Sequence, residues 1–321
     1  MRRLGWLCLG AVLLGYPWLL SGALFQRFGA LILLWAIAAS AWNIIGGLAG
    51  QVSVGHAVFF GAGAYLPLLV FNHWQWSPLA GVPLGVLVSM AVALGIGVPT
   101  FRLQGHYFSM ATIAVAELIR LLVGNWDFVG AAVGLSGPAV SRGWFVLSCR
   151  GVVPYYYIFL VVLVVLLLVT WHLQRSRMGY YLRAIRAGER AARSLGVPVR
   201  RYKLYALMLS AAFTSLAGSL YAVMIGFVDP DSTIGILVSV KMVIIAALGG
   251  AGALLGPLLG AAILIPLEEA TNALFGGGGS GLTFIFYGGI IMLIARFEPG
   301  GLLEIWHRLR LKQEERQRRA A

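Results

Sequence analysis

The segment GYYLRAIRAGERAARSLGVPVRRYK, residues Gly179–Lys203, decides the fold class because it interrupts an otherwise apolar chain. Between Arg175 and Lys203 the chain carries nine Lys or Arg residues and a single acidic residue, Glu189. One Arg or Lys at the centre of a membrane helix costs about 2.5–3.5 kcal/mol. The segment is therefore predicted to be a loop outside the hydrocarbon, on the cytoplasmic side that positive charge marks.

Within this loop, Gly188, Gly196 and Pro198 divide a helical pattern into two short helices. The apolar residues that recur at helical spacing are Leu182, Ile185, Ala192 and Leu195. Arginines surround the small Ala191–Ala192 pair, which indicates a compact docking surface rather than a flexible tether. The same charge pattern also fits an amphipathic helix lying on anionic lipid, and this alternative stays open.

The composition of the whole chain predicts a polytopic membrane protein. Hydrophobic residues make up 60% and charged residues 11%, with a mean hydropathy of +0.87, whereas about a quarter of a soluble domain is charged. The net charge of +13 does not indicate nucleic acid, because 18 of the 24 basic residues lie at Arg2–Arg3, in the basic loop and from Arg296 onward. That distribution is typical of positive charge facing the cytoplasm. Two cysteines, Cys8 and Cys149, predict no disulfide framework, and no spacing predicts a metal site.

Hydrophobic runs predict an all-α bundle of about ten spans, with eight to ten allowed, forming a single membrane domain over 1–321. The docking loop occupies 173–203 and a basic tail 297–321, and both termini are expected in the cytoplasm. The first run is long enough to span and is expected to be retained rather than cleaved as a signal peptide. The predicted spans are Leu4–Leu24, Phe28–Ile45, Val52–Phe71, Leu79–Val98, His106–Val123, Val152–Trp171, Leu204–Phe227, Ile234–Leu248, Leu254–Leu267 and Leu282–Ala295.

Two Gly-rich segments, Gly46–Gly63 and Gly249–Gly260, are predicted to hold half-helices or re-entrant pieces. Gly and polar residues interrupt the first one, and broken helices can present polar groups to a substrate. Candidate residues of a translocation path are Asn43, Gln51, Ser53, His56, Glu117 and Arg120.

Glu117 and Arg120 stand one helical turn apart, so they can form a structural ion pair or line the path. Lys241 is expected to snorkel or to pair with Asp231 or Glu268.

Gly252, Gly256 and Gly260 recur at every fourth position, which predicts a helix face without side chains that a neighbouring backbone can approach. The neighbouring backbone is expected to belong to the same chain. A backbone of another subunit is the alternative.

Signatures of an intramembrane enzyme are missing from the sequence, which has no HExxH, no GxSxG and no phosphate-binding loop ending in GKT or GKS. Ser53 and His56 lie three apart, but such a pair on a Gly-rich segment more often packs than reacts. The chain also has too few central acids to favour a cation-coupled transporter. If ATP drives this protein, another chain is expected to hydrolyse it.

Four motifs in order resemble the permeases of ATP-binding-cassette importers, in particular the longer permease of the branched-chain amino-acid branch. They are the basic loop, with its Ala-Ala-x-x-x-Gly core at Ala191, Ala192 and Gly196; WNIIGGLAGQVSVGHAVFFGAGAY from Trp42; RLQGHYFSMATIAVAEL from Arg102; and LGGAGALLGPLLGA from Leu248.

This resemblance implies a bacterial inner-membrane permease that pairs with a second permease. It further implies two cytoplasmic ATPases and an extracytoplasmic binding protein as partners, with ATP bound by the ATPases and no cofactor held by this chain. The basic loop would dock on the ATPase through Arg183, Arg186, Glu189, Arg190, Ala191, Ala192, Leu195 and Gly196. Permeases for urea and short amides look alike in the same motifs, so the substrate stays open between these and amino acids.

Overall fold

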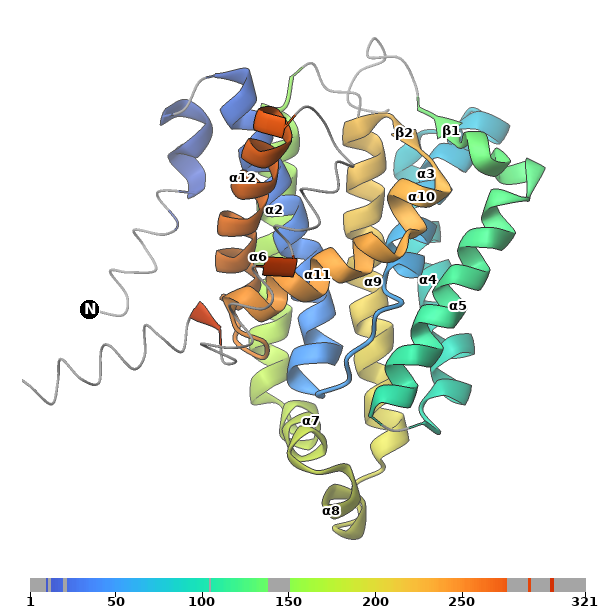
Figure 1. The fold of residues 1–321 in the computed structure, drawn as a ribbon, viewed down its shortest axis with the longest axis vertical. Coiled ribbons are helices and arrows are strands. Elements are labelled where there is room, and N and C mark those ends of the chain that lie inside the picture. Colours follow the sequence, from blue (N-terminus) through green and yellow to red (C-terminus); the bar gives the residue numbers. More distant parts are fainter. Residues whose placement is uncertain are drawn as a thin grey trace, which may run out of the picture.

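The computed structural model describes residues 10, 13–19, 22–103, 105–137, 151–275, 288–289 and 301–302. Over these residues the chain is a bundle of helices (Figure 1). The long helices are α2 (Ala23–Asn43), α3 (Ala57–Trp74), α4 (Pro78–Thr100), α5 (His106–Gly124), α6 (Val153–Arg175), α9 (Val199–Ile225), α11 (Ile236–Gly249) and α12 (Gly256–Phe275). Shorter elements are a π-helix (Ile44–Leu48), two 3₁₀ turns (Asp127–Val129 and Ala131–Val133), α7 (Arg177–Ala187), α8 (Glu189–Ser194), α10 (Pro230–Ile234) and the strands β1 (Leu135–Ser136) and β2 (Phe227–Val228).

Helix α2 is the centre of the bundle and packs against α6, α9, α11 and α12. Its residues from Gly29 to Asn43 are apolar or small on every side, and nearly all of them are buried. A helix that is hydrophobic all round lies in a protein core or spans a membrane. Helices α4 and α5, in contrast, expose most of their apolar surface. α2 is therefore the buried centre of the bundle, and α4 and α5 lie at its outside.

Helices α3 and α9 are in direct backbone contact. A Cβ atom added to Gly63 would lie 1.9 Å from the carbonyl oxygen of Ser215, and one added to Gly218 would lie 1.9 Å from that of Phe60. Ser219 also donates a hydrogen bond to the Gly63 carbonyl at 2.8 Å. Small residues that let backbones approach this closely are the main packing device of membrane helices. α9 therefore fixes the position of α3 and, with it, the end of the segment that precedes α3.

Every predicted span between Phe28 and Leu267 coincides with a described helix. Seven helical segments of the described chain have the length and composition of membrane spans, the first running from Ala23 to Leu48 and the last from Pro230 to Gly249. The prediction of an all-α, multi-pass membrane protein is confirmed. The predicted spans Leu4–Leu24 and Leu282–Ala295 lie mostly outside the described residues, as does the basic tail, so the predicted number of ten remains a prediction.

The structure confirms that helices are interrupted in both Gly-rich segments. After the π-helix the chain runs without regular structure from Ala49 to His56, rising from the lower end of α2 to the start of α3 (Figure 1). A second turn, Gly250–Leu255, separates α11 from α12. We call residues 44–56, the π-helix together with the irregular stretch after it, the first break, and residues 250–255 the second break. Irregular backbone at membrane depth needs hydrogen-bond partners from the protein itself.

The glycine repeat before and within α12 does not form one helix face. Gly252 lies in the second break with φ +91°, in the left-handed region, and only Gly256 and Gly260 belong to the helix. The prediction of a three-glycine face is wrong, because the chain turns at Gly252 rather than continuing a helix through it. Close packing within the chain is confirmed at Gly260, where an added Cβ would lie 2.0 Å from the Ile245 carbonyl oxygen of α11.

Strands β1 and β2 pair antiparallel at the end of the bundle opposite α7 and α8 (Figure 1). Leu135 faces Val228 and Ser136 faces Phe227 in this pairing. The two strands come from the segment after α5 and from the turn after α9, and the ten predicted spans put these two segments on the same side of the membrane. Their pairing agrees with that part of the predicted topology.

Candidate functional site

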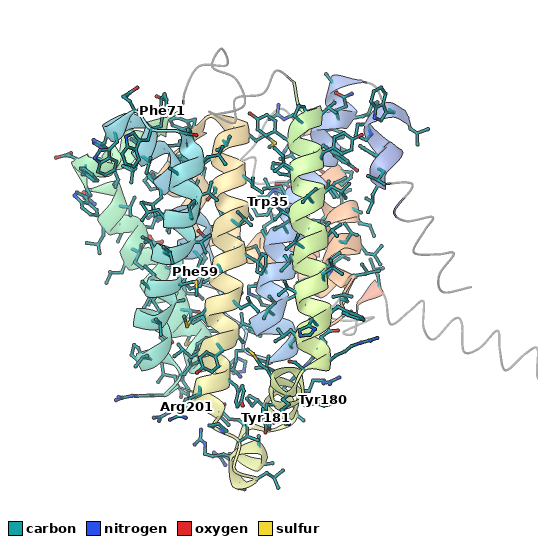
Figure 2. All side chains as sticks on the ribbon, turned by 180° about the vertical axis from the view of Figure 1, so that it is seen from behind. Trp35, Phe59, Phe71, Tyr180, Tyr181 and Arg201 are labelled. Atoms are coloured by element: carbon teal, nitrogen blue, oxygen red, sulfur yellow. The ribbon has the colours of Figure 1, made fainter. Side chains whose placement is uncertain are left out.

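The basic loop folds as the two predicted short helices, α7 and α8, beyond one end of the bundle (Figure 1). Ser176 begins α7, and its side chain accepts a hydrogen bond from the backbone N–H of Gly179 at 3.3 Å. Hydroxyl side chains at this position satisfy backbone donors at a helix start. Figure 2 shows the neighbouring Tyr180 and Tyr181 on the same projecting loop. The loop is a compact, folded object, as predicted.

One face of the loop is buried against the rest of the chain. Leu182, Ile185 and Ala192 are at most 2% exposed. Because α8 packs on α7 and α9, the side of α8 that carries Ala192 faces inward. The expectation that Ala192 makes the contact with an ATPase is therefore corrected, since this side chain is already covered by its own protein.

The opposite face of α8 is open and carries a large apolar side chain. Leu195 is 82% exposed, and Ala191, Arg190 and Gly196 are exposed around it. Leu195 shares the helical spacing of Leu182 and Ile185 in the sequence, but α8 ends at Ser194, so Leu195 does not join their buried face. Gly196 lies in the turn after α8 with φ +82°, which glycine adopts without strain. The exposed tip is therefore Ala191, Leu195 and Gly196.

Two arginines of α7 bond to carbonyl oxygens of their own chain. The Arg186 guanidinium donates to Gly47 at 2.5 Å and to Ala251 at 3.5 Å. Arg183 donates to the Gln174 carbonyl at 3.1 Å. The Arg186 side chain is also exposed, so its contact with an ATPase stays a prediction, while its Nη1 atom is engaged by both helix breaks.

Glu189 begins α8, as predicted, but its carboxylate is held by two cations. Lys203 Nζ lies 2.5 Å from one carboxylate oxygen and Arg193 Nη2 lies 3.0 Å from the other. Lys203 is fully buried and also donates to the side-chain oxygen of Gln51 at 3.0 Å.

Sequence reasoning missed Lys203 as a site residue. A signal was present, because the buried face of α9 repeats through Val199, Lys203, Ala206 and Ser210 at helical spacing. A lysine on such a face needs a partner. Glu189 was the obvious partner for Lys203, because it is the single acidic residue of the loop.

The two breaks are joined to each other through Asn43. Its amide nitrogen donates to the Ala253 carbonyl at 2.9 Å, and its amide oxygen accepts from the Gly252 N–H at 2.8 Å. Both groups belong to the second break, whereas Asn43 ends α2. Asn43 thus supplies hydrogen bonds that the interrupted backbone needs, and it is 2% exposed.

Ser53 and His56 form a closed hydrogen-bond chain in the first break. His56 Nε2 lies 2.8 Å from Ser210 Oγ, which itself donates to the Ala41 carbonyl. Ser210 must therefore accept from a protonated Nε2, and Nδ1 accepts from Ser53 Oγ at 3.0 Å. His56 is fully buried and neutral in this arrangement. The pair fits the packing role that the sequence favoured over a catalytic one.

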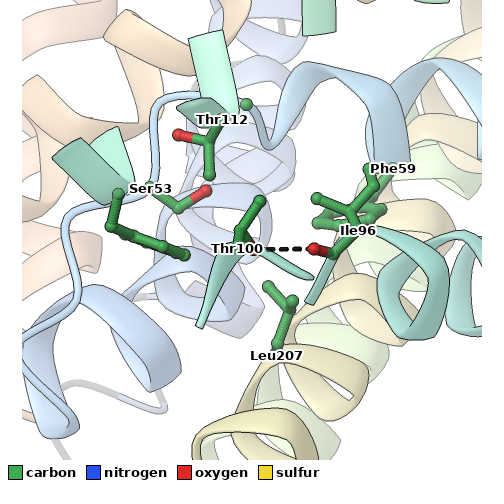
Figure 3. A pocket seen from close by; sticks show the side chains of 8 residues that line it. Ser53, Phe59, Ile96, Thr100, Thr112 and Leu207 are labelled. Carbon is green, nitrogen blue, oxygen red and sulfur yellow. Dashed lines mark hydrogen bonds between the residues drawn. The ribbon is translucent and has the colours of Figure 1, made fainter. Parts of the chain in front are cut away.

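The cavity beside Ser53 is too small for a substrate. It has a volume of about 10 Å³, room for roughly one water molecule. Figure 3 shows Ser53, Thr112, Thr100 and Phe59 around it. In this conformation Asn43, Ser53 and His56 are buried and hydrogen-bonded, and Gln51 is bonded to Lys203. Their place on a translocation path stays a prediction.

Glu117 and Arg120 form the predicted ion pair, with Arg120 Nη2 at 2.5 Å from Glu117 Oε1. Asp231 of α10 is a third member and contacts Arg120 Nη1. The Glu117 side chain is 46% exposed although it lies on α5, a candidate span. Charge facing hydrocarbon is costly, so this exposed cluster fits water or a protein partner better than lipid.

Lys241 contacts Glu268, one of its two predicted partners, and lies 4.2 Å from the Trp35 ring centroid. Among the described residues, no group of three or more His, Cys, Asp or Glu side chains could hold a metal ion.

Comparison with known proteins places this geometry in a family. Residues 25–295 match the family described as "Branched-chain amino acid transport system / permease component". The chain is 31% identical over 284 residues to the high-affinity branched-chain amino acid transport system permease protein LivM of Salmonella typhimurium, covering 81% of this chain and 65% of that relative. The LivM protein of Escherichia coli is 30% identical, with the same coverage.

A second type of relative is less similar. The permease protein LivH of Salmonella typhimurium is 24% identical over 255 residues, covering 74% of this chain and 82% of that relative. The chain spans just under two thirds of the length of the LivM proteins. No solved structure matches.

Proposed function

The chain belongs to the branched-chain amino acid transport permease family, and from this premise we propose that it is a membrane-spanning subunit of an ATP-driven importer. The family match over residues 25–295 carries the proposal. Its relatives are named as transport permeases, which fits a transporter subunit rather than an enzyme. The substrates are branched-chain amino acids, as in the names of those relatives.

The α7–α8 loop is the docking site for a cytoplasmic ATPase. Its exposed tip presents Leu195 between the small residues Ala191 and Gly196, and Arg190 beside them supplies charge. An isolated large apolar side chain at the end of a basic loop is suited to insertion in a pocket. The small neighbours allow a close approach of the two backbones. ATP is bound and hydrolysed by that partner.

The α7–α8 end of the bundle faces the cytoplasm and the β1–β2 end faces outward. Basic residues gather on α7, α8 and the first turn of α9, whereas Asp127, Asp229 and Asp231 lie near the other end. This asymmetry supports the orientation through the preference of Lys and Arg for the cytoplasmic side. The membrane is the bacterial inner membrane, with both termini inside. A substrate-binding protein would meet the β1–β2 end.

A second permease packs on the exposed face of α5. The cluster of Glu117, Arg120 and Asp231 lies near the outward end of this face, where contact with lipid would be unfavourable. A partner permease would cover the apolar residues Leu118 and Leu121 and leave the charges along a shared path.

The test of the transported substrate is uptake by vesicles. The chain is purified with the subunits that accompany it, reconstituted into liposomes containing ATP and supplied with labelled leucine. ATP-dependent uptake that excess isoleucine or valine inhibits is expected. Inhibition by urea or acetamide but not by isoleucine would contradict the amino-acid assignment, and uptake without ATP would contradict the importer assignment.

A further inference from the structure

Both helix breaks are tied to the α7–α8 loop by cations that the exposed docking tip does not use. Arg186 of α7 donates to Gly47 in the first break and to Ala251 in the second. Lys203, at the start of α9, joins Glu189 of α8 to Gln51 in the first break. The loop is therefore connected to the two segments in which the run of α-helix is interrupted.

Lys203 is the stronger of the two connections because its ammonium is fully buried. It lies 2.5 Å from Glu189, 3.0 Å from Gln51 and 5.8 Å from the centre of the Phe101 ring at the end of α4. An ammonium at such a site needs its partners, since a buried charge left unpaired is strongly unfavourable. A shift of α8 that moves Glu189 must therefore move Lys203 or break the pair. Either event changes how Gln51 is held.

Arg186 sits tightly against both breaks. A Cβ atom added to Gly252 would lie 2.3 Å from its Nη1 atom, and one added to Gly50 would lie 2.9 Å from its Cγ atom. Both glycines have positive φ, so the backbone adopts there a conformation that most residues avoid. Since Asn43 bonds the second break to the end of α2, a displacement of α7 through Arg186 acts on both breaks together.

We infer that Lys203 and Arg186 are the transmission residues of this permease: they convert movement of the docking loop into rearrangement of the two helix breaks. Lys203 links α8 to Gln51, and Arg186 links α7 to Gly47 and Ala251. Opening of the closed first break would proceed through these links, because the Ser53–His56 chain and Asn43 otherwise hold it shut. The inference rests on the proposed docking of the loop on an ATPase.

The experiment measures leucine taken up per ATP hydrolysed by the reconstituted complex. One variant is Lys203→Met, which keeps the length of the side chain without its charge. Another is Gln51→Leu, which removes the acceptor of Lys203 in the first break and leaves the loop unchanged. Arg186→Gln tests the second link. The matched control is Arg200→Met, an exposed cation one turn before Lys203 on the same helix.

We expect Lys203→Met, Gln51→Leu and Arg186→Gln to keep the copurified ATPase but to lower uptake per ATP at least about fivefold, the lower range of energetic coupling between sites. Arg200→Met should match the wild type. Should Lys203→Met fail to fold, Gln51→Leu decides, because it removes one acceptor and keeps the Lys203–Glu189 pair.

An unchanged ratio in Gln51→Leu and Arg186→Gln would overturn the inference, as would a loss of ATPase from these complexes, which would make the residues structural supports of the docking surface. These results leave the proposed function intact when the wild-type complex takes up leucine with ATP. Failure of the wild type to do so would overturn the proposed function and the inference with it.

Discussion

Replacing Leu195 with alanine tests whether the exposed tip of α8 is a docking residue. Leu195 is 82% exposed, so the substitution removes almost no packing from the permease, and surface changes of this kind stay within about 0.5 kcal/mol of wild-type stability. If a pocket of the ATPase covers the side chain, three carbon atoms lose their burial. At about 0.8 kcal/mol per methylene, scaled by the exposed fraction, binding weakens by about 2 kcal/mol.

This difference corresponds to a dissociation constant about 30-fold higher. It is measured by titrating the detergent-solubilised permease with its purified ATPase and following binding by interferometry. Leu87→Ala is the control, because Leu87 is also exposed but lies on α4, away from the loop. Leu182→Ala is the contrasting variant, since it creates a cavity in the buried face of the same loop and should cost about 2–5 kcal/mol of stability.

An unchanged affinity of Leu195→Ala, with Leu87→Ala also unchanged, would refute the docking assignment of the tip. A thermal midpoint that falls as far as in Leu182→Ala would refute the exposure on which the estimate depends.

Gly218→Ala places a methyl group against the α3 backbone and should lower stability by about 1–3 kcal/mol in thermal unfolding. Gly95→Ala, with open space around it, should be neutral or stabilising. Equal midpoints of the two variants would contradict the α3–α9 contact. Asn43→Ala leaves the Gly252 N–H and the Ala253 carbonyl without their partner and should lower stability by about 1–3 kcal/mol, so wild-type unfolding would argue against the junction of the breaks. Cysteines introduced at Ser136 and Ser194, with Cys8 and Cys149 replaced by alanine, should react with an impermeant maleimide from opposite sides of the membrane, and labelling from the same side would disprove the topology.

The positions of the helices could be predicted from the sequence because hydrocarbon imposes a length and a composition on each span. The interruptions could be predicted too, since Gly and polar residues disrupt the apolar pattern around Gly47–His56 and Gly249–Gly260. Their consequences were harder to foresee. Gly252 fits the repeat of Gly256 and Gly260 in the sequence but lies in the turn before α12, and spacing alone does not show where that helix begins.

The orientation of the loop residues depended on tertiary packing. Ala191 and Ala192 are adjacent small residues, yet one is exposed and the other buried, because α8 rests on α9. Arg186 has the same surroundings in sequence as Arg183 but reaches the two breaks, which are about 65 and 139 residues away along the chain. Contacts over such separations require the folded bundle, so periodicity could not assign them.

The most direct test of the central claim, that the α7–α8 loop docks on an ATPase, is a photo-crosslinking measurement at Leu195. A photoreactive amino acid replaces Leu195 in the assembled complex in native membranes, and a second sample carries it at Leu168, an exposed residue of the membrane helix α6. After illumination, the account predicts a covalent adduct between the ATPase and the permease labelled at Leu195, and none for the Leu168 position. Adducts of the Leu195 position with lipid alone would contradict the account and support a loop that lies on the membrane surface.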